Sequence, residues 1–144
     1  MYTQSHSQRI SGLAAATVWQ VWTDVDRWTE WQEDLESARL DGEFRAGGTF
    51  TLRPKGGPNV KVELTEVVAN SRYTDVTRFP LAEMTGVHAI IVHGRELELK
   101  TTISVTGPLA FLWTRLVAKG VVAGLPEQTR RLVARTLKGE AVAA

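Results

Sequence analysis

The chain has 144 residues, of which 43% are hydrophobic and 23% charged, and its formal net charge is +1. This length and balance are typical of a soluble globular protein, so we expect a single domain over residues 1–144. The near-neutral charge gives no support for a nucleic-acid or anionic-membrane partner, and the absence of cysteine excludes disulfides and thiolate chemistry. The polar start and the lack of a long apolar run predict a cytoplasmic protein without membrane insertion.

The first part of the chain predicts a strand, two short helices and two further strands. Residues 2–10 are rich in Thr, Ser, Gln and Tyr and predict an extended strand with a polar inner face. Residues 13–23 change to helical spacing, and Asp24 is a suitable N-cap for a second short helix. Segments 35–41 and 48–53 are predicted strands. We expect the tryptophans of the helices to hold them against the sheet: Trp19, Trp22, Trp28 and Trp31.

Two hairpins can be registered from their turns. The first turns at Asn70-Ser71, which pairs Val68 with Tyr73, Leu64 with Thr77, and Val62 with Phe79. Its other face then brings Glu63 to Arg78 as a solvent-side ion pair. The second turns at Gly94-Arg95 and pairs Val92 with Leu97, Ile90 with Leu99, His88 with Thr101, and Gly86 with Ile103. Strict alternation over residues 96–105 specifies this second register, because a slip by one residue would bury three charges.

Residues 109–137 predict one long helix that begins after Gly107-Pro108. Its expected inner stripe consists of Leu109, Leu112, Leu116, Leu132 and Thr136. Gly120, Gly124 and Pro126 predict a kink or a break in the middle. One helix cannot cover a flat sheet of about six strands, so the sheet must curl around the helix and leave a hollow between them. The expected fold is therefore α+β, with a curved antiparallel sheet wrapped around a long C-terminal helix.

Three stretches of the chain are similar to one known superfamily. They are Val18 to Trp31, close to a "VW…DV…W..W" run, Leu40-Asp41-Gly42 through Gly47-Gly48-Thr49, and the junction Gly107-Pro108-Leu109-Ala110. In these the chain resembles the SRPBCC superfamily, the START-like or birch-pollen-allergen-like helix-grip proteins. The resemblance covers nearly the whole chain and implies a polyketide cyclase/dehydrase-like member among binders of hydrophobic ligands. A shared fold does not fix the activity.

Polar groups on the inner face of the sheet are the candidates for function. His88 falls inside by the hairpin register, opposite Thr101. It is either a hydrogen-bonded structural histidine or a ligand contact and acid/base group. His6 and Gln8 share the parity of Ile10. They either line a cavity for an oxygenated ligand or lie in solvent on an edge strand.

Tyr73 is the second candidate for acid/base catalysis, beside His88. Glu66 and Asp75 oppose each other on the predicted inner face, unless a bulge turns Glu66 outward. The orientation of Arg53 stays open. The other predicted ligand-lining residues are Val62, Leu64, Thr77, Phe79, Ile90, Leu99, Thr101, Ile103 and Trp113. Neither a metal nor a cofactor is expected, because the chain has no metal-ligand spacing and no cofactor fingerprint.

Three functions stay open at this stage. The first is a binder or carrier that holds a lipid, an isoprenoid, a polyketide-like or an aromatic compound in an internal cavity. The second is a polyketide cyclase or dehydratase in which His88, Tyr73 or His6 promotes enolisation, aldol closure or loss of water. The third is a partner-binding module or homodimer, because the outer parity of strand 84–94 is apolar at Val87, Ala89 and Ile91.

Overall fold

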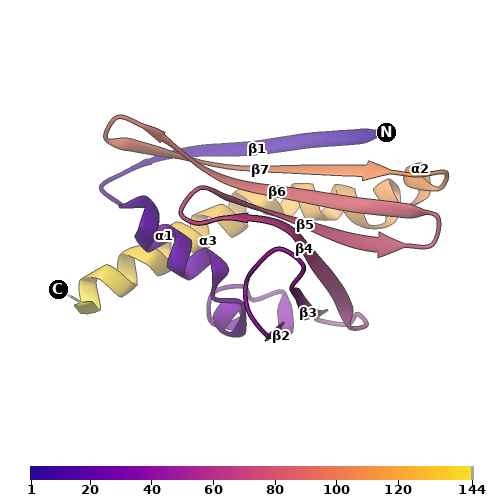
Figure 1. The fold of residues 1–144 in the computed structure, drawn as a ribbon, viewed down its shortest axis with the longest axis horizontal. Coiled ribbons are helices and arrows are strands. Elements are labelled where there is room, and N and C mark those ends of the chain that lie inside the picture. Colours follow the sequence, from indigo (N-terminus) through magenta and orange to yellow (C-terminus); the bar gives the residue numbers. More distant parts are fainter. Residues whose placement is uncertain (144) are drawn as a thin grey trace.

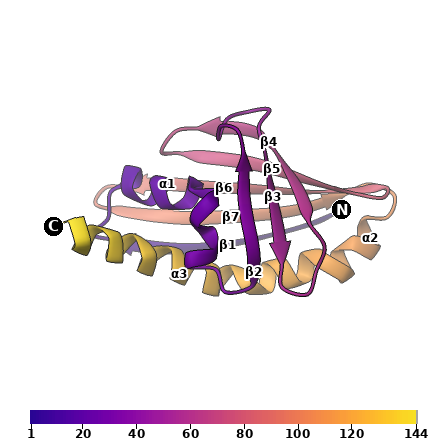
Figure 2. The same ribbon diagram turned by 90° about the horizontal axis from the view of Figure 1, so that it is seen from below.

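A computed structural model describes residues 1–143 as a seven-stranded antiparallel sheet with helices on one face. The elements in chain order are β1 (Tyr2–Ser11), α1 (Ala15–Thr23), the 3-10 helix η1 (Val25–Glu30), β2 (Leu35–Asp41), β3 (Thr49–Pro54), β4 (Val60–Val68), β5 (Arg72–Phe79), β6 (Ala82–His93), β7 (Glu96–Thr106), α2 (Ala110–Trp113), the π-helical turn η2 (Thr114–Ala118) and α3 (Lys119–Ala143). The sheet curves around α3 (Figure 1, Figure 2). The predicted α+β helix-grip architecture is confirmed.

The strands are ordered β1-β7-β6-β5-β4-β3-β2, so β7 pairs with both β1 and β6. The hairpin of β6 and β7 has the predicted register, with Val92 opposite Leu97 and His88 opposite Thr101. The inward side chains of β7 are all buried: Leu97, Leu99, Thr101, Ile103 and Val105. This alternation is the feature that the sequence pattern specifies most strongly.

The predicted register of β4 and β5 is wrong. Val68 pairs with Arg72 rather than with Tyr73, because the turn contains three residues, 69–71, instead of two. Asn70 occupies the left-handed region there, at φ 62°. Asparagine tolerates this conformation better than most residues, which allows the longer turn.

A second shift in the same hairpin lies between Leu64 and Glu66, where Thr65 is left unpaired as a bulge. Further along, the pairs are Leu64 with Asp75 and Val62 with Thr77. The longer turn shifts the pairing by one residue, and the bulge shifts it by one more. Because side chains alternate between faces with a period of two, the predicted inner residues of β4 and β5 still face inward. The predicted ion pair also forms, with 2.9 Å between Arg78 Nη1 and Glu63 Oε1.

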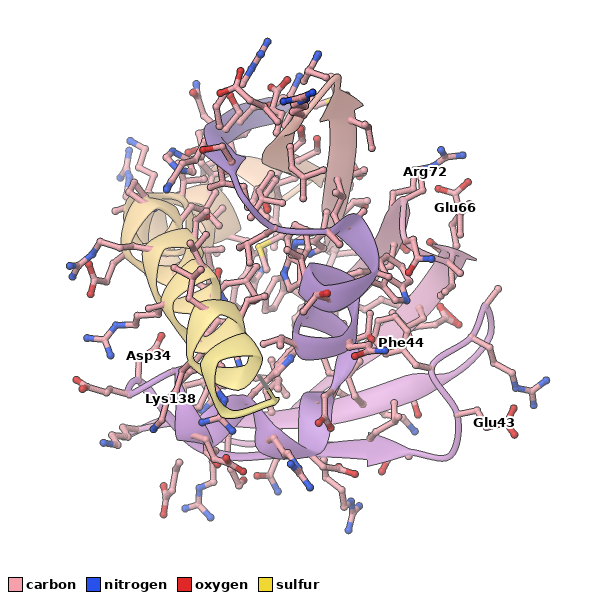
Figure 3. The ribbon with its side chains drawn as sticks, turned by 90° about the vertical axis from the view of Figure 1, so that its left-hand side faces the viewer. Asp34, Glu43, Phe44, Glu66, Arg72 and Lys138 are labelled. Carbon is pink, nitrogen blue, oxygen red and sulfur yellow. The ribbon has the colours of Figure 1, made fainter. Side chains whose placement is uncertain are left out.

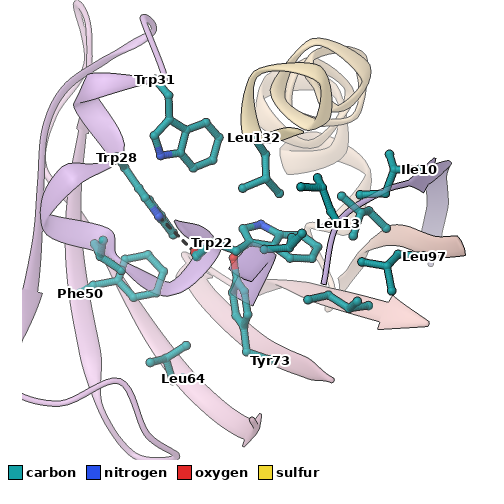
Figure 4. Packing of buried hydrophobic residues seen from close by; sticks show 14 of the residues in the cluster. Ile10, Leu13, Trp22, Trp28, Trp31, Phe50, Leu64, Tyr73, Leu97 and Leu132 are labelled. Carbon is teal, nitrogen blue, oxygen red and sulfur yellow. Dashed lines mark hydrogen bonds between the residues drawn. The ribbon is translucent and has the colours of Figure 1, made fainter. Parts of the chain in front are cut away.

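Two apolar clusters fill the space between the sheet and the helices. The first lies under α1 and the C-terminal half of α3, and its members include Trp22, Trp28, Trp31, Phe50, Tyr73 and Leu132 (Figure 4). In it the indole N–H of Trp28 donates to the carbonyl oxygen of Trp22 at 3.2 Å. The second lies under α2, η2 and the start of α3: Ala82, Ile103, Val105, Ala110, Ala118 and Leu125.

The inner stripe of the C-terminal helical segment agrees with the prediction at Leu132 and Thr136 but differs from it at Leu112 and Leu116. Its buried residues are Ala110, Thr114, Ala118, Leu125, Thr129, Leu132 and Thr136. Leu112 is 37% exposed and Leu116 is 63% exposed. Small side chains let the start of the segment lie close to the sheet, and the π-helical turn η2 changes the helical phase there. The helix does not break at Pro126, which lies inside α3.

The outer face of β6 carries the apolar side chains that the sequence analysis assigned to it. Val87 and Ala89 are half-buried, and Ile91 is 37% exposed. A homodimer through this face stays a prediction. Among the described residues, the helices are too short or too polar to cross a membrane.

Leu132 and Leu116 allow a test of the inner stripe. We expect Leu132→Ala to lower the free energy of unfolding by about 2–5 kcal/mol, because it leaves a cavity between α3 and the sheet. Leu116→Ala should change it by less than about 0.5 kcal/mol, because this side chain lies mostly in solvent. Urea unfolding followed by tryptophan fluorescence measures both. Equal losses would show that the stripe is assigned wrongly.

Candidate functional site

Polar side chains form a line across the inner face of the sheet, one from each of four neighbouring strands. His6 of β1 lies opposite Thr101 of β7, Thr101 lies opposite His88 of β6, and His88 lies opposite Tyr73 of β5. Residues directly opposite each other project from the same face of a sheet, so all four face α3. We call these four residues, together with Asp75, the polar row.

Thr101 of the polar row lies between the two apolar clusters, whereas Tyr73 belongs to both the polar row and the first cluster. Along β7, Leu97 and Leu99 belong to the first cluster and Ile103 to the second, with Thr101 between them. Along α3 the same order appears: Leu132 belongs to the first cluster, Leu125 to the second, and Thr129 is buried between them. The core is therefore divided by a polar layer that reaches from the sheet towards the helix.

His88 is held through both ring nitrogens. Its Nε2 lies 2.8 Å from Asp75 Oδ2, and its Nδ1 lies 3.3 Å from Thr101 Oγ1. The side chains of His88 and Asp75 are only 14% and 17% exposed. An ionised carboxylate only accepts, so the arrangement that satisfies all three groups has Nε2–H donating to Asp75 and Nδ1 accepting from the Thr101 hydroxyl. This arrangement fixes the tautomer and leaves Nδ1 as the basic nitrogen.

Aromatic rings surround the imidazole of His88. Tyr73 stacks on it with 4.4 Å between the ring centroids and 21° between the planes. Trp22 of α1 meets it edge to face at 5.7 Å, and Figure 4 shows Trp22 above Tyr73. Burial raises the pKa of the Tyr73 hydroxyl well above its usual value, and the charge of Asp75 adds to this effect. Tyr73 therefore keeps its proton and suits a hydrogen-bond donor rather than a base.

Gly86 makes room for the contact between His88 and Asp75. It lies opposite Asp75 on β5, and a Cβ atom at this position would lie 2.9 Å from both Asp75 Oδ1 and His88 Nε2. Gly86 pairs with Ile103 as predicted, but its role beside Asp75 and His88 was not predicted from the sequence. The signal in the sequence is a glycine inside a strand, two residues before an inward histidine, because such a glycine often marks a place where neighbouring groups approach closely.

His6 carries an unused polar atom. Its Nε2 is buried and has no hydrogen-bond partner among the described residues. His6 and Gln8 are half-buried, and Ile10 is buried on the same parity, as expected for an inward face of β1. Two strand spacings of about 4.8 Å each separate His6 from His88. The polar row thus offers hydrogen-bonding groups at both ends of a span of about 10 Å.

The orientations that the sequence left open are now assigned. The bulge turns Glu66 outward, where Arg72 donates to it at 2.9 Å on the outside of the sheet (Figure 3). This hydrogen bond lowers the pKa of the Glu66 carboxyl. Asp75 alone stays inside and contacts His88. Arg53 lies in solvent, with Nε 3.4 Å from Glu36 Oε2.

The structure divides the predicted ligand-lining residues between the two clusters. Val62, Leu64, Ile90 and Leu99 belong to the first cluster and Ile103 to the second, while Thr77 is buried on β5. Phe79 and Trp113 stack at 4.5 Å beside the second cluster, and the Trp113 N–H donates to the Pro80 carbonyl at 3.0 Å. The predicted residues are thus on the inner side, but only His6, Tyr73, His88 and Thr101 form the polar row.

Two hollows lie away from the polar row. One of about 350 Å³ is lined by residues of β1, α2, η2 and the start of α3, and one of about 300 Å³ by the loop 32–34 and α3. Neither is lined by a predicted site residue, so the internal cavity stays a prediction. Among the described side chains, no three His, Asp or Glu groups are close enough together to hold a metal ion.

The curved sheet around α3 is a helix-grip fold, and the family profile that matches the chain identifies it as a member of the SRPBCC superfamily. The sequence profile of the family "Polyketide cyclase / dehydrase and lipid transport" matches residues 1–140, and the chain belongs to this family. No curated protein sequence matches the chain.

Solved structures of the same fold share little sequence with this chain. Protein MLL2253 from Mesorhizobium loti is 17% identical with a TM-score of 0.73, and the match covers 95% of this chain and 97% of that chain. Norcoclaurine synthase from Thalictrum flavum, solved with dopamine and hydroxybenzaldehyde, is 12% identical with a TM-score of 0.71, covering 93% and 87%. Ara h 8.0201 is 11% identical with a TM-score of 0.70, covering 95% and 99%. At these identities the likeness shows the fold alone.

Gly86 and Gly120 form a matched pair for testing the site geometry. We expect Gly86→Ala to lower the free energy of unfolding by about 1–3 kcal/mol, because the new methyl group must push Asp75 and His88 apart. Gly120→Ala should raise it by up to about 1 kcal/mol, because nothing lies within 4 Å of that position in α3. Urea midpoints measure both. A Gly86→Ala variant as stable as the parent would contradict the close contact between the two side chains.

Proposed function

We propose that the protein binds a hydrophobic small molecule with oxygen substituents, such as a lipid, an isoprenoid or a polyketide-like compound, between the sheet and α3. One observation carries this proposal: a polar row with an unpaired, buried His6 Nε2 lies on the inner face of the sheet beside two apolar clusters. An unpaired buried polar atom costs free energy, and a ligand oxygen that bonds to it would remove that cost. Membership of a family described by polyketide cyclases and lipid transport supports the same class of ligand.

The two apolar clusters suit the hydrocarbon parts of such a ligand. Leu99 and Ile103 lie on either side of Thr101 along β7, so a molecule bound at the polar row contacts apolar groups in both directions. A few polar groups in an apolar pocket orient a ligand, since each hydrogen bond fixes one atom of it. In this proposal the ligand separates the clusters when it binds and creates the internal cavity that the sequence predicts.

His6 provides the test of binding. The probe is prodan, a neutral naphthyl ketone whose fluorescence shifts on leaving water. We expect the protein to bind prodan, and His6→Phe to weaken binding about 2–10-fold through the lost hydrogen bond. The thermal midpoint should not fall, because His6 Nε2 makes no bond within the protein.

His93 is the matched control for His6, because it lies on the outer face and contacts Glu98 at 2.8 Å. His93→Phe should leave prodan affinity unchanged. Unaltered affinity in His6→Phe, or equal losses in both variants, would overturn the assignment of His6. Native mass spectrometry of the purified protein would identify any ligand that is retained from the cell.

A second candidate function is acid/base catalysis of the cyclase or dehydratase type, and the contact between His88 and Asp75 favours it. In this mechanism His88 Nδ1 removes a proton from a carbon next to a ligand carbonyl, and the C–H electrons form an enolate. Asp75 stabilises the imidazolium that results, and the Tyr73 hydroxyl donates to the enolate oxygen. The imidazolium then returns its proton to a leaving hydroxyl group, which departs as water while the enolate electrons form the new double bond.

Proton exchange measures this second function separately from binding. We expect the protein to accelerate deuterium exchange at the methylene group of an aryl 1,3-diketone in D₂O, followed by NMR. His88→Gln keeps hydrogen bonding but removes the base, so the protein-dependent rate should fall about 100-fold while prodan binding survives. His93→Gln should exchange at the parent rate. If binding and thermal stability fall together in His88→Gln, the residue is structural and the catalytic proposal fails.

A further inference from the structure

Exposed apolar side chains gather at one end of the molecule. Phe111 is 70% exposed, Leu116 63% and Leu81 64%. Leu81, in the turn between β5 and β6, lies next to α2, because the Leu109 amide donates to the Leu81 carbonyl at 3.0 Å. This end also holds the start of β1 (Figure 1). We call Leu81, Phe111, Arg115, Leu116 and Lys119 the α2 end surface.

The helical segment repeats its exposed positions every four residues: 111–112, 115–116 and 119–120. The π-helical turn η2 widens the helix there, so residues four and five apart share one side. Phe111, Arg115, Leu116 and Lys119 therefore project together into solvent. The inner stripe of the same segment consists of Ala110, Thr114 and Ala118.

The charged side chains of the α2 end surface are both basic, Arg115 and Lys119. Between residues 107 and 126 the sequence contains Arg115 and Lys119 and neither Asp nor Glu. Neither cation forms an ion pair with a described residue, whereas most arginines elsewhere in the described chain do. The net charge of +1 conceals this local excess, because acidic residues elsewhere balance it. Free cations beside exposed apolar groups complement an anionic, partly apolar partner.

The hollow of about 350 Å³ opens within this surface and is lined by Tyr2, Phe111, Thr114, Arg115 and Lys119, among others. Thr114 is 8% exposed, and its buried Oγ1 has no hydrogen-bond partner among the described residues. A hydroxyl group and two cations around one hollow can receive the phosphate of a lipid headgroup. The aromatic and aliphatic groups beside it can enter the acyl boundary.

We propose that the α2 end surface docks the protein on an anionic phospholipid bilayer. Phe111, Leu116 and Leu81 enter the interface, and Arg115 and Lys119 contact the headgroups. A bilayer fits better than an acidic protein groove, because Leu81 comes from the turn between β5 and β6 while Phe111 and Leu116 come from the helical segment, so the apolar groups extend beyond one helical face. The inference uses residues outside the polar row, so it stands or falls independently of the proposed function.

Co-sedimentation with vesicles tests the proposal on the intact protein. We expect it to pellet with vesicles of phosphatidylcholine and phosphatidylglycerol in equal parts, but not with phosphatidylcholine alone, and to dissociate as salt is added. Arg115→Gln and Lys119→Gln should each lower the partition coefficient about fivefold. Leu116→Ser should lower it at constant charge. Because all three side chains are exposed, circular dichroism should show unchanged folding.

Val92 and Arg95 provide a matched control at the opposite end of the sheet. Val92 is 62% exposed, close to the 63% of Leu116, and Arg95 is exposed in the turn between β6 and β7. The double variant Val92→Ser, Arg95→Gln should partition like the parent. The proposal is overturned if the parent stays in solution with anionic vesicles, or if the control and the α2-end variants lose binding equally. A stable dimer that Leu116→Ser dissociates would also contradict it, because a second copy would then cover the surface.

Discussion

The alternation of β7 determines which side chains of three strands face α3. Its outward positions carry Glu96, Glu98 and Lys100, so a slip by one residue would place these charges against the apolar clusters. Because β7 pairs with β1 on one side and β6 on the other, its register also aligns His6, Thr101 and His88 in a single line. The position of the polar row is therefore a consequence of keeping charged residues out of the core.

The sequence predicts this part of the molecule well for the same reason. The two-residue turn at Gly94-Arg95 and the alternation over 96–105 both act locally, so the hairpin register and the contact between His88 and Thr101 can be derived without a structure. The hairpin of β4 and β5 has no such pattern. Its three-residue turn depends on Asn70 in a left-handed conformation, whereas its bulge at Thr65 is the alternative that the sequence already offers for Glu66.

Other features were missed because they depend on contacts between distant segments. Asp75 meets His88 only after the bulge turns Glu66 outward, and the need for Gly86 follows only from that meeting. The helical spacing of the leucines places Leu112 and Leu116 on the inner stripe, where the structure has Ala110, Thr114 and Ala118. Close approach of the helix to the sheet instead selects small residues, and no local signal marks the π-helical turn η2.

The division of the core has an energetic meaning. Each cluster packs apolar side chains on its own side, whereas between them His88 donates a hydrogen bond to Asp75 and accepts one from Thr101. A hydrogen-bonded polar layer contributes less net stabilisation than packed hydrocarbon, because its groups give up water to form their bonds. The hydrogen bonds of His88 join β5, β6 and β7, so they hold neighbouring strands together and do not connect the sheet to α3.

The polar row takes its residues from four neighbouring strands, one each from β1, β7 and β6 and two from β5. Apolar residues that specify the register lie at other positions of the same strands. A substitution at His6 or Thr101 therefore alters the pattern of donors and acceptors without changing the alternation that builds the sheet. In the proposed function His6, Thr101 and His88 would contact the ligand, whereas the apolar residues of the same strands specify the register. A substitution at one polar-row position can then change which ligand groups are bound, while the apolar positions that specify the fold stay the same.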